Sequence, residues 1–315
     1  MTRRNTTLGF LFILLTSCSG LMDSPPQPTP TRRERSLPTQ ARKITPGQDP
    51  HPPQIHHPAW EAPQPVPGPI NTAGGEDSPF IPPGGEELYF FFTPDVSLPA
   101  ERQLSDGQTG LYRSQQESGG WGEPQRLVLN DDVALDGCPF VLEDALWFCS
   151  ARPGSTGVGW FKAVREGQAW VDWEPVVFPE SYQVGEFHIT STGDQLFFGS
   201  SRPGTEGGSD LWVSRRSGEE WGEPVNLQAV NSGADESRPF LTADGKELWF
   251  TRTYQGSPGV FRSVKKDQYW SPPELILSSF AGEPTLDPEG NIYFAHHYFL
   301  EGEMVEADLY LARKK

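Results

Sequence analysis

A tryptophan followed two or three residues later by a proline recurs five times along this chain. A loop rich in Asn, Gly and acidic residues follows most copies, and then a short apolar stretch. The spacing of about 50 residues is typical of repeat architectures such as propellers. The chain is therefore expected to fold as a series of similar units, each marked by one copy: Trp60–Pro63, Trp121–Pro124, Trp173–Pro175, Trp221–Pro224 and Trp270–Pro272.

Each repeat unit contains the pattern of a β-hairpin. Residues 237–250 predict a strand, an Asp-Gly turn and a second strand rich in β-forming residues. A third strand is expected at 259–263 and a fourth at 274–277, and four short antiparallel strands make one propeller blade. Similar hairpins are expected at 79–92, 139–148, 187–198 and 284–294. Since no helical periodicity competes, we predict an all-β, five-bladed β-propeller.

The two ends of the repeat region are complementary. The last unit ends soon after its third strand, whereas the first Trp motif precedes the first hairpin. We expect the segment 60–70 to supply the missing outer strand of the last blade and so to close the ring, which removes exposed strand edges. The propeller domain is assigned to residues 60–315.

The residues before the propeller have the character of an export signal and a tether. Residues 1–17 combine a basic start with a short apolar run at Leu8–Leu15, too short to span a bilayer. The sequence Leu15-Thr-Ser-Cys18 resembles the lipobox of bacterial lipoproteins, which implies lipidation of Cys18 and sorting to the outer membrane. A plain secretory signal is the alternative. Residues 18–59 are Pro-rich and poor in apolar residues, and predict a disordered tether with a reach of roughly 120 Å.

The repeats resemble a known family. The turn Thr242-Ala-Asp-Gly-Lys246, the segments Ser200–Gly204 and Gly207–Trp212, and the motif Trp221–Pro224 look like the WD40-like repeats of TolB-type propellers. The resemblance covers residues 60–315 and is best over 186–250. It implies a propeller that acts in the bacterial cell envelope.

Composition and motifs limit the possible functions. The formal net charge of −17 argues against nucleic acid as a partner, because an acidic domain repels phosphate backbones. The motifs Gly-x-Ser-x-Gly, His-Glu-x-x-His and the P-loop are absent. We therefore expect no catalytic residue, cofactor or metal, and a monomer that contacts the membrane through its lipid anchor alone.

Two cysteines fall in one predicted hairpin. Cys138 and Cys149 face each other if the strands pair symmetrically about the turn at Glu143-Asp144. An exported chain meets an oxidising compartment, which favours a disulfide over two buried thiols.

Acidic residues stand just before the inner strand of each unit. Repetition would place them on one rim of the central channel, where they concentrate negative potential for a cation or a basic segment. The alternative is that each caps a loop or pairs with an arginine. These candidates are Glu76, Asp77, Asp136, Glu186, Asp235, Glu236 and Glu283.

Two functional classes follow. The first is a membrane-tethered envelope module that binds a protein or a wall polymer through one face of the ring. The second is a glycoside hydrolase or lyase with carboxylates in the central pit.

Overall fold

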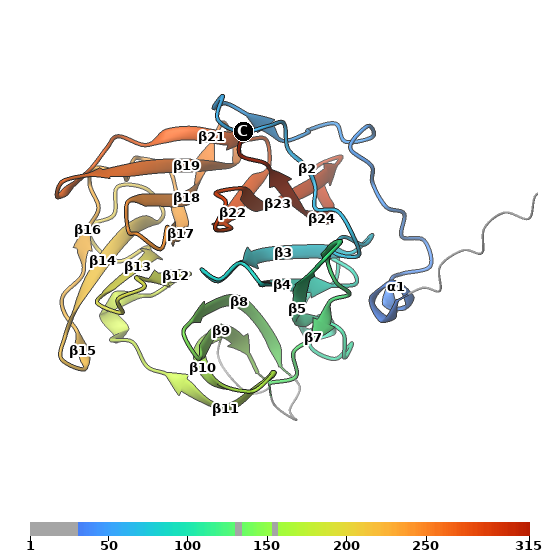
Figure 1. Ribbon diagram of the computed structural model, residues 1–315, viewed down its shortest axis with the longest axis horizontal. Coiled ribbons are helices and arrows are strands. Elements are labelled where there is room, and N and C mark those ends of the chain that lie inside the picture. Colours follow the sequence, from blue (N-terminus) through green and yellow to red (C-terminus); the bar gives the residue numbers. More distant parts are fainter. Residues whose placement is uncertain (1–30, 130–133, 153–156) are drawn as a thin grey trace, which may run out of the picture.

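The computed structural model describes residues 31–129, 134–152 and 157–315 (Figure 1). The predicted signal peptide and Cys18 lie outside the described residues. The expected all-β fold is confirmed, since strands dominate and the helical segments are short: α1 (Arg32–Ser36), α2 (Ala100–Gln103) and the 3₁₀ turn η1 (Glu180–Tyr182). None of the described helices is long and apolar enough to cross a bilayer.

Strands that line the centre of the molecule are followed by antiparallel partners that lead outward (Figure 1). We call these central strands the inner strands: β3 (Gly75–Phe80), β8 (Leu135–Leu142), β12 (Phe187–Ile189), β17 (Glu236–Leu241) and β22 (Ala281–Leu286). Neighbouring inner strands contact one another, as β3 does with β8 and β22. The radial arrangement of antiparallel sheets is propeller-like.

The remaining strands extend from the inner ones in chain order. After β3 come β4 (Glu87–Thr93), β5 (Gly110–Glu117), β6 (Gly120–Trp121) and β7 (Gln125–Arg126). After β8 come β9 (Ala145–Ala151), β10 (Val158–Glu166) and β11 (Ala169–Val176). After β12 come β13 (Gln195–Ser200), β14 (Asp210–Ser217), β15 (Glu220–Trp221) and β16 (Val225–Asn226). After β17 come β18 (Glu247–Tyr254), β19 (Ser257–Lys266), β20 (Tyr269–Trp270) and β21 (Glu274–Ser278), and after β22 come β23 (Ile292–Leu300) and β24 (Glu303–Ala312).

The two ends of the repeat region pair with each other. The short strand β2 (Gln64–Pro65) lies antiparallel to β24, with Gln64 opposite Leu311. Trp60 forms a further bridge to Lys314, and β24 also contacts β3 in parallel at Ala307 and Gly75. The segment 60–70 thus lies where the missing outer strand was expected.

The segment before the repeats differs from the expected disordered tether. Residues 31–59, which we call the strap, lie against the sheets, and β1 (Gln54–Ile55) pairs with β21. The side chains of Arg33 and Lys43 form ion pairs with residues of β3 and β24, and Asp49 forms a hydrogen bond with His296 of β23. A segment with few apolar residues is ordered here because its charged groups find buried partners.

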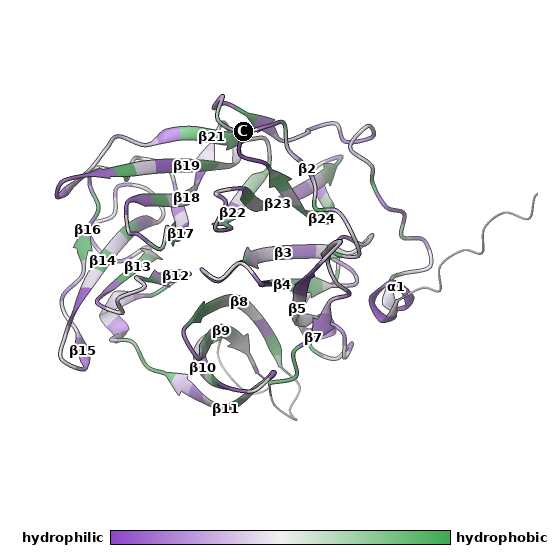
Figure 2. Ribbon diagram, viewed as in Figure 1, coloured by the Kyte–Doolittle hydropathy of each residue, from purple (hydrophilic) through white to green (hydrophobic). Residues whose placement is uncertain are grey.

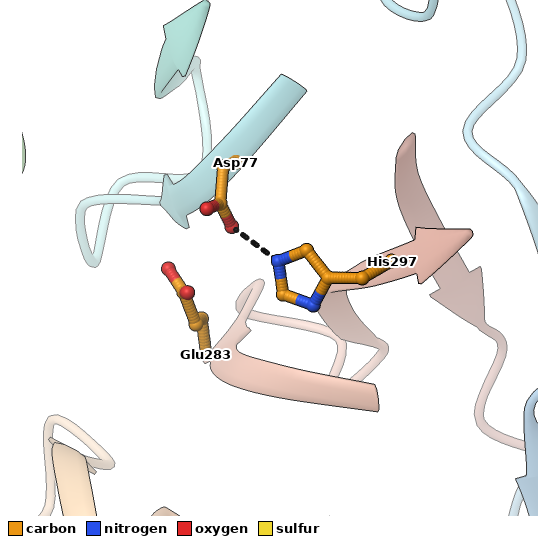
Figure 3. A group of neighbouring side chains, drawn as sticks. All are labelled: Asp77, Glu283 and His297. Carbon is orange, nitrogen blue, oxygen red and sulfur yellow. Dashed lines mark ion pairs between the residues drawn. The ribbon is translucent and has the colours of Figure 1, made fainter. Parts of the chain in front are cut away.

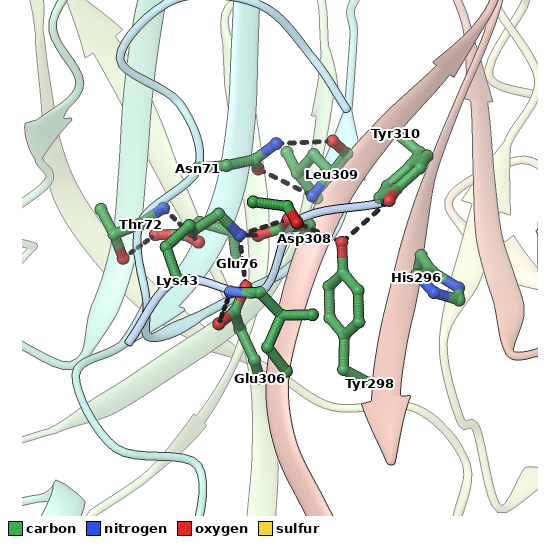
Figure 4. A network of polar contacts seen from close by, with 12 residues as sticks. Lys43, Asn71, Thr72, Glu76, His296, Tyr298, Glu306, Asp308, Leu309 and Tyr310 are labelled. Atoms are coloured by element: carbon green, nitrogen blue, oxygen red, sulfur yellow. Dashed lines mark hydrogen bonds and ion pairs between the residues drawn. The ribbon is translucent and has the colours of Figure 1, made fainter. Parts of the chain in front are cut away.

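The buried residues that contact the strap belong to a polar network between β3 and β24 (Figure 4). Lys43 pairs with both Glu306 and Asp308, while Arg33 lies 3.1 Å from the carboxylate of Glu76. All three carboxylates are buried, so the two strap cations supply their countercharge.

The predicted disulfide between Cys138 and Cys149 is present, with the Cα atoms 5.4 Å apart. The predicted strand register holds only near the turn, where Phe140 pairs with Trp147. A bulge follows, and Gly137 rather than Cys138 lies opposite Cys149. Cys138 has a left-handed backbone (φ 51°), so the bulge itself turns its side chain toward Cys149.

Aromatic residues dominate the packing between the sheets. Trp60 meets Trp249 edge-on at 5.5 Å, and Trp270 meets Phe197 at 6.2 Å, in each case across neighbouring units. Hydrophobic residues follow the strands, whereas α1 is hydrophilic (Figure 2). Trp60 and Trp270 thus pack between neighbouring units.

Candidate functional site

A bulge recurs in four of the five inner strands. In β3, β8, β17 and β22 the register shifts by one residue. At each shift a non-glycine residue has a left-handed backbone directly before a proline: Ser78 (φ 51°), Cys138 (φ 51°), Arg238 (φ 53°) and Glu283 (φ 59°). Such backbones cost on the order of 1–3 kcal/mol each, and bulges re-aim side chains. These four residues, together with Glu186 before β12, line a small cavity that we call the mouth.

Arg238 is the centre of the ion pairs in the mouth. Its guanidinium pairs with Glu283 and lies 3.4 Å from Glu186, and it donates a hydrogen bond to the hydroxyl of Ser78 at 3.3 Å. These partners come from three different inner-strand segments. Arg238 therefore joins the units across the opening.

Asp77, Glu283 and His297 form a second group (Figure 3), which Arg238 contacts through Glu283. The carboxylate of Asp77 lies 3.5 Å from Nε2 of His297. One potential ligand atom from each residue lies within 4.8 Å of the others. Oxygen and imidazole ligands suit a divalent metal ion, but the carboxylate of Glu283 is already engaged by the guanidinium of Arg238. The sequence contains no short motif for this set, because its members come from β3, β22 and β23.

The pKa values of the two carboxyl groups move in opposite directions. Burial raises the pKa of Glu283 to about 8, and the charge of Asp77 adds to the rise while Arg238 opposes it. Burial would also raise the pKa of Asp77, but His297 and Arg238 outweigh it and hold that pKa below its ordinary range. Burial likewise opposes the charged form of His297, yet Asp77 and Glu283 raise its pKa. Asp77 is therefore the ionised member, and Glu283 retains a proton more readily.

Aromatic side chains form the floor of the mouth. Phe80, Phe140, His188 and Phe240 line the cavity on its inner side. His188 lies edge-on to Phe140 at 4.9 Å and to Phe240 at 5.1 Å. The mouth above this floor has a volume of about 70 Å³.

The acidic candidates from the sequence divide into two groups. Asp77, Glu186 and Glu283 come together around Arg238 and His297. Glu76, Asp136 and Glu236 point elsewhere, because side chains alternate along a strand. Asp235 precedes β17. Glu76 contacts Arg33, Glu236 contacts Arg252 and Asp235 accepts a hydrogen bond from the amide of Gly208. Asp136 is buried, and its pKa is raised by burial although Ser150 and Arg152 oppose the shift.

Three residues of the centre were not candidates from the sequence. His297 lies on β23 and contacts Asp77 beside the mouth, although the two positions are far apart in the chain. Ser78 contacts Arg238 only because of the bulge. His188 could have been found, since it stands where other units have phenylalanine after the bulge.

Comparisons with known proteins give distant similarities only. No protein-family model and no curated protein matches the chain. Among solved structures, TolB from Acinetobacter baumannii is 15% identical with a TM-score of 0.42, covering 72% of this chain and 53% of its own. A gluconolactonase from Xanthomonas campestris is 10% identical with a TM-score of 0.43, covering 84% of this chain and 95% of its own.

A third similar structure is the Bacteroides ovatus xyloglucan PUL protein GH43B, which is 14% identical with a TM-score of 0.47. The match covers 78% of this chain and 53% of GH43B. The chain thus spans about half the length of the solved TolB and GH43B chains.

Proposed function

We propose that this protein is a lipid-anchored binding module of the bacterial cell envelope, which captures a basic segment of a partner protein at the mouth. The proposal includes a five-bladed, TolB-type propeller closed by β2, export by residues 1–17 and anchoring through Cys18 to the outer membrane. The recurrence of an inner strand with two antiparallel partners, as in β17–β19, supports the blade assignment, and the β2–β24 pairing supports closure.

The carboxylates at the mouth carry the proposal. Glu186 and Glu283 line the mouth and Asp77 lies beside it, and the cations that contact these carboxylates among the described residues are Arg238 and His297. The side chains of Glu186 and Asp77 are 33% and 27% exposed, so an arriving ammonium or guanidinium group can reach them. A lysine or arginine side chain is narrow enough for the space above the aromatic floor.

The size of the mouth favours binding of a side chain over binding of a sugar. Pockets for small molecules usually enclose about 300–1,000 Å³, whereas the mouth encloses about 70 Å³. A polymer would rest on the surface with one group inserted. A protein segment that presents one cationic side chain satisfies this geometry.

A direct test uses a fluorescent oligolysine peptide as the probe. We expect saturable binding that weakens with salt, because the attraction is electrostatic. Glu186→Gln should reduce the affinity several-fold, whereas Glu220→Gln, an exposed acid on β15, should leave it unchanged. Equal affinities for the two variants would refute binding at the mouth. Crosslinking in native membranes, compared between the same two variants, then identifies the partner.

One observation favours a glycoside hydrolase or lyase as a second candidate. Asp77 and Glu283 form a pair of neighbouring carboxyl groups with oxygen atoms no more than 4.8 Å apart, and glycosidases act through a pair of carboxyl groups. Their pKa values differ in the manner of a nucleophile and a general acid. The test is hydrolysis of a panel of 4-nitrophenyl glycosides, in which activity lost in both Asp77→Asn and Glu283→Gln would favour the enzyme. Absence of activity with intact oligolysine binding would favour the binding module.

A further inference from the structure

A second, larger cavity lies at the end of the inner strands opposite the mouth. It has a volume of about 540 Å³, which is within the range of small-molecule sites. The residues that follow the aromatic floor along each inner strand form its wall, including Ile81, Val141, Ile189, Leu241 and Leu286. The aromatic floor of Phe80, Phe140, His188 and Phe240 separates it from the mouth.

The composition of this cavity changes from floor to opening. The wall is aliphatic and the floor is aromatic, whereas charged residues of both signs stand at the opening. Asp244 and Lys246, which pair at 3.5 Å and are largely exposed, are examples. An uncharged molecule can therefore enter without leaving a charge in an apolar wall.

His188 breaks the repeat pattern at the floor. The residue two positions after the bulge is phenylalanine in β3, β8 and β17, and it is Thr285 in β22. The hydroxyl of Thr285 accepts a hydrogen bond from the amide of Ile81, which satisfies it within the protein. Phenylalanine satisfies the packing at this position in three other units. His188 therefore adds two polar nitrogen atoms that packing does not require.

The imidazole of His188 is buried without a hydrogen-bond partner. Its side chain belongs to a residue that is 8% exposed, and its contacts are with the rings of Phe80, Phe140 and Phe240. Within the part of the chain that the structure describes, neither ring nitrogen has a hydrogen-bond partner. The ring nitrogens are not sealed from solvent, and the residue lines the second cavity, so a ligand in that cavity can pair with them.

The ring is also uncharged at physiological pH, since burial lowers the pKa of His188 to about 3. A neutral imidazole offers one N–H donor and one acceptor nitrogen. A hydroxyl group can pair with either nitrogen, because it both donates and accepts hydrogen bonds. The floor thus suits a ligand that carries a single hydroxyl group on an apolar, preferably planar, body, because aromatic faces and edges pack well together.

We propose that this second cavity is a binding site for a small, uncharged aromatic alcohol, whose ring lies against the aromatic floor and whose hydroxyl group hydrogen-bonds to His188. The site is independent of the proposed function at the mouth. It uses the opposite end of the inner strands and needs none of the mouth carboxylates.

The test compares 4-methylphenol with toluene, which has the same ring and methyl group but no hydroxyl. Binding to the full chain is followed by calorimetry and by the ¹⁵N resonances of the histidine side chains. We expect 4-methylphenol to bind at least tenfold more tightly than toluene and to shift the resonances of His188. A site that hydrogen-bonds a hydroxyl discriminates strongly against the analogue that lacks it.

The diagnostic variant is His188→Phe, which places the residue of three other units at this position and is therefore expected to fold. It should bind the two compounds equally, whereas Glu186→Gln, at the mouth, should keep the wild-type preference. The proposal is overturned if neither compound binds saturably to the wild type, if both bind equally, or if His188→Phe keeps the preference for 4-methylphenol.

Discussion

Asp49 of the strap and His296 of β23 lie 2.8 Å apart, and both side chains are almost fully buried. A segment that was expected to be a solvated tether thus contributes a buried group to the folded domain. Burial lowers the pKa of His296, although Asp49 opposes the shift, so the contact is a hydrogen bond to a largely neutral ring at neutral pH.

Replacing Asp49 should destabilise the fold. Asp49→Ala removes the partner of a buried imidazole, which typically costs about 1–3 kcal/mol in the free energy of unfolding. Urea unfolding measures this loss. Glu61→Ala, at an exposed acid nearby, is the matched control and should have little effect. Equal stability of both variants would mean that the strap contact contributes nothing.

Arg33 and Glu76 should be strongly coupled. The guanidinium of Arg33 is buried beside the Glu76 carboxylate and beneath the rings of Phe90, Phe92 and Tyr112. Arg33→Met leaves that carboxylate without its cation, at a cost of about 3–5 kcal/mol.

The double variant Arg33→Met/Glu76→Gln should recover part of that loss, because glutamine carries no charge. A double-mutant cycle measured by urea unfolding gives the coupling free energy. Arg32→Met, at the exposed neighbour on α1, is the control. Strictly additive losses would contradict the coupling.

The contribution of Glu76 and Glu306 to stability should decrease as the pH rises from 5 to 8. Burial raises the pKa of Glu76 and of Glu306 to about 7, above the ordinary 4.5, although the strap cations oppose both shifts. The folded protein then binds more protons than the unfolded chain between those values. The free energy of unfolding is therefore highest below about pH 4.5 as far as these groups are concerned, and falls as the pH passes through the raised pKa values.

Glu306→Gln should flatten this profile by on the order of 1–3 kcal/mol between pH 5 and pH 8. Glu303→Gln, an exposed acid on β24, should keep the wild-type slope. Urea unfolding at several pH values provides the measurement. Equal slopes for Glu306→Gln and the wild type would show that the Glu306 carboxyl group ionises freely in the folded state.

The disulfide should survive in the exported protein and stabilise it modestly. Thiol titration of denatured, unreduced protein should find neither Cys138 nor Cys149 free. The bond closes a sequence separation of only 11 residues within a hairpin. The Cys138→Ser/Cys149→Ser variant should therefore lose less than the roughly 3 kcal/mol of a 15-residue loop. Two reactive thiols in the native sequence would refute the bond.

The sequence predicted the positions of the strands better than it predicted their pairing register. Trp-Pro motifs and Asp-Gly turns located the hairpins, because these patterns depend on local geometry. The symmetric register placed Cys138 opposite Cys149, but the bulge at Cys138 shifts the pairing by one residue. That bulge depends on a left-handed backbone before proline, which the pattern of apolar residues does not reveal.

The candidate site was predicted only in part for a similar reason. Adjacent acids such as Glu76 and Asp77 look equivalent in the sequence, yet they point to opposite sides of β3 and have different partners. The contacts of Lys43 with Glu306 and Asp308 join the strap to the last strand. Composition describes how many apolar residues a segment has, and it cannot reveal such a specific long-range pairing.

The attachment of the strap also changes how a membrane anchor would act on this protein. With Cys18 lipidated as proposed, Arg33, which is bound to the domain, lies only 15 positions after the anchor. A segment of that length spans at most about 50 Å, less than half of the roughly 120 Å expected for the whole segment. The domain would then remain close to the bilayer with the side formed by β3 and β24 nearest the anchor, and would meet partners near the membrane surface rather than search the compartment.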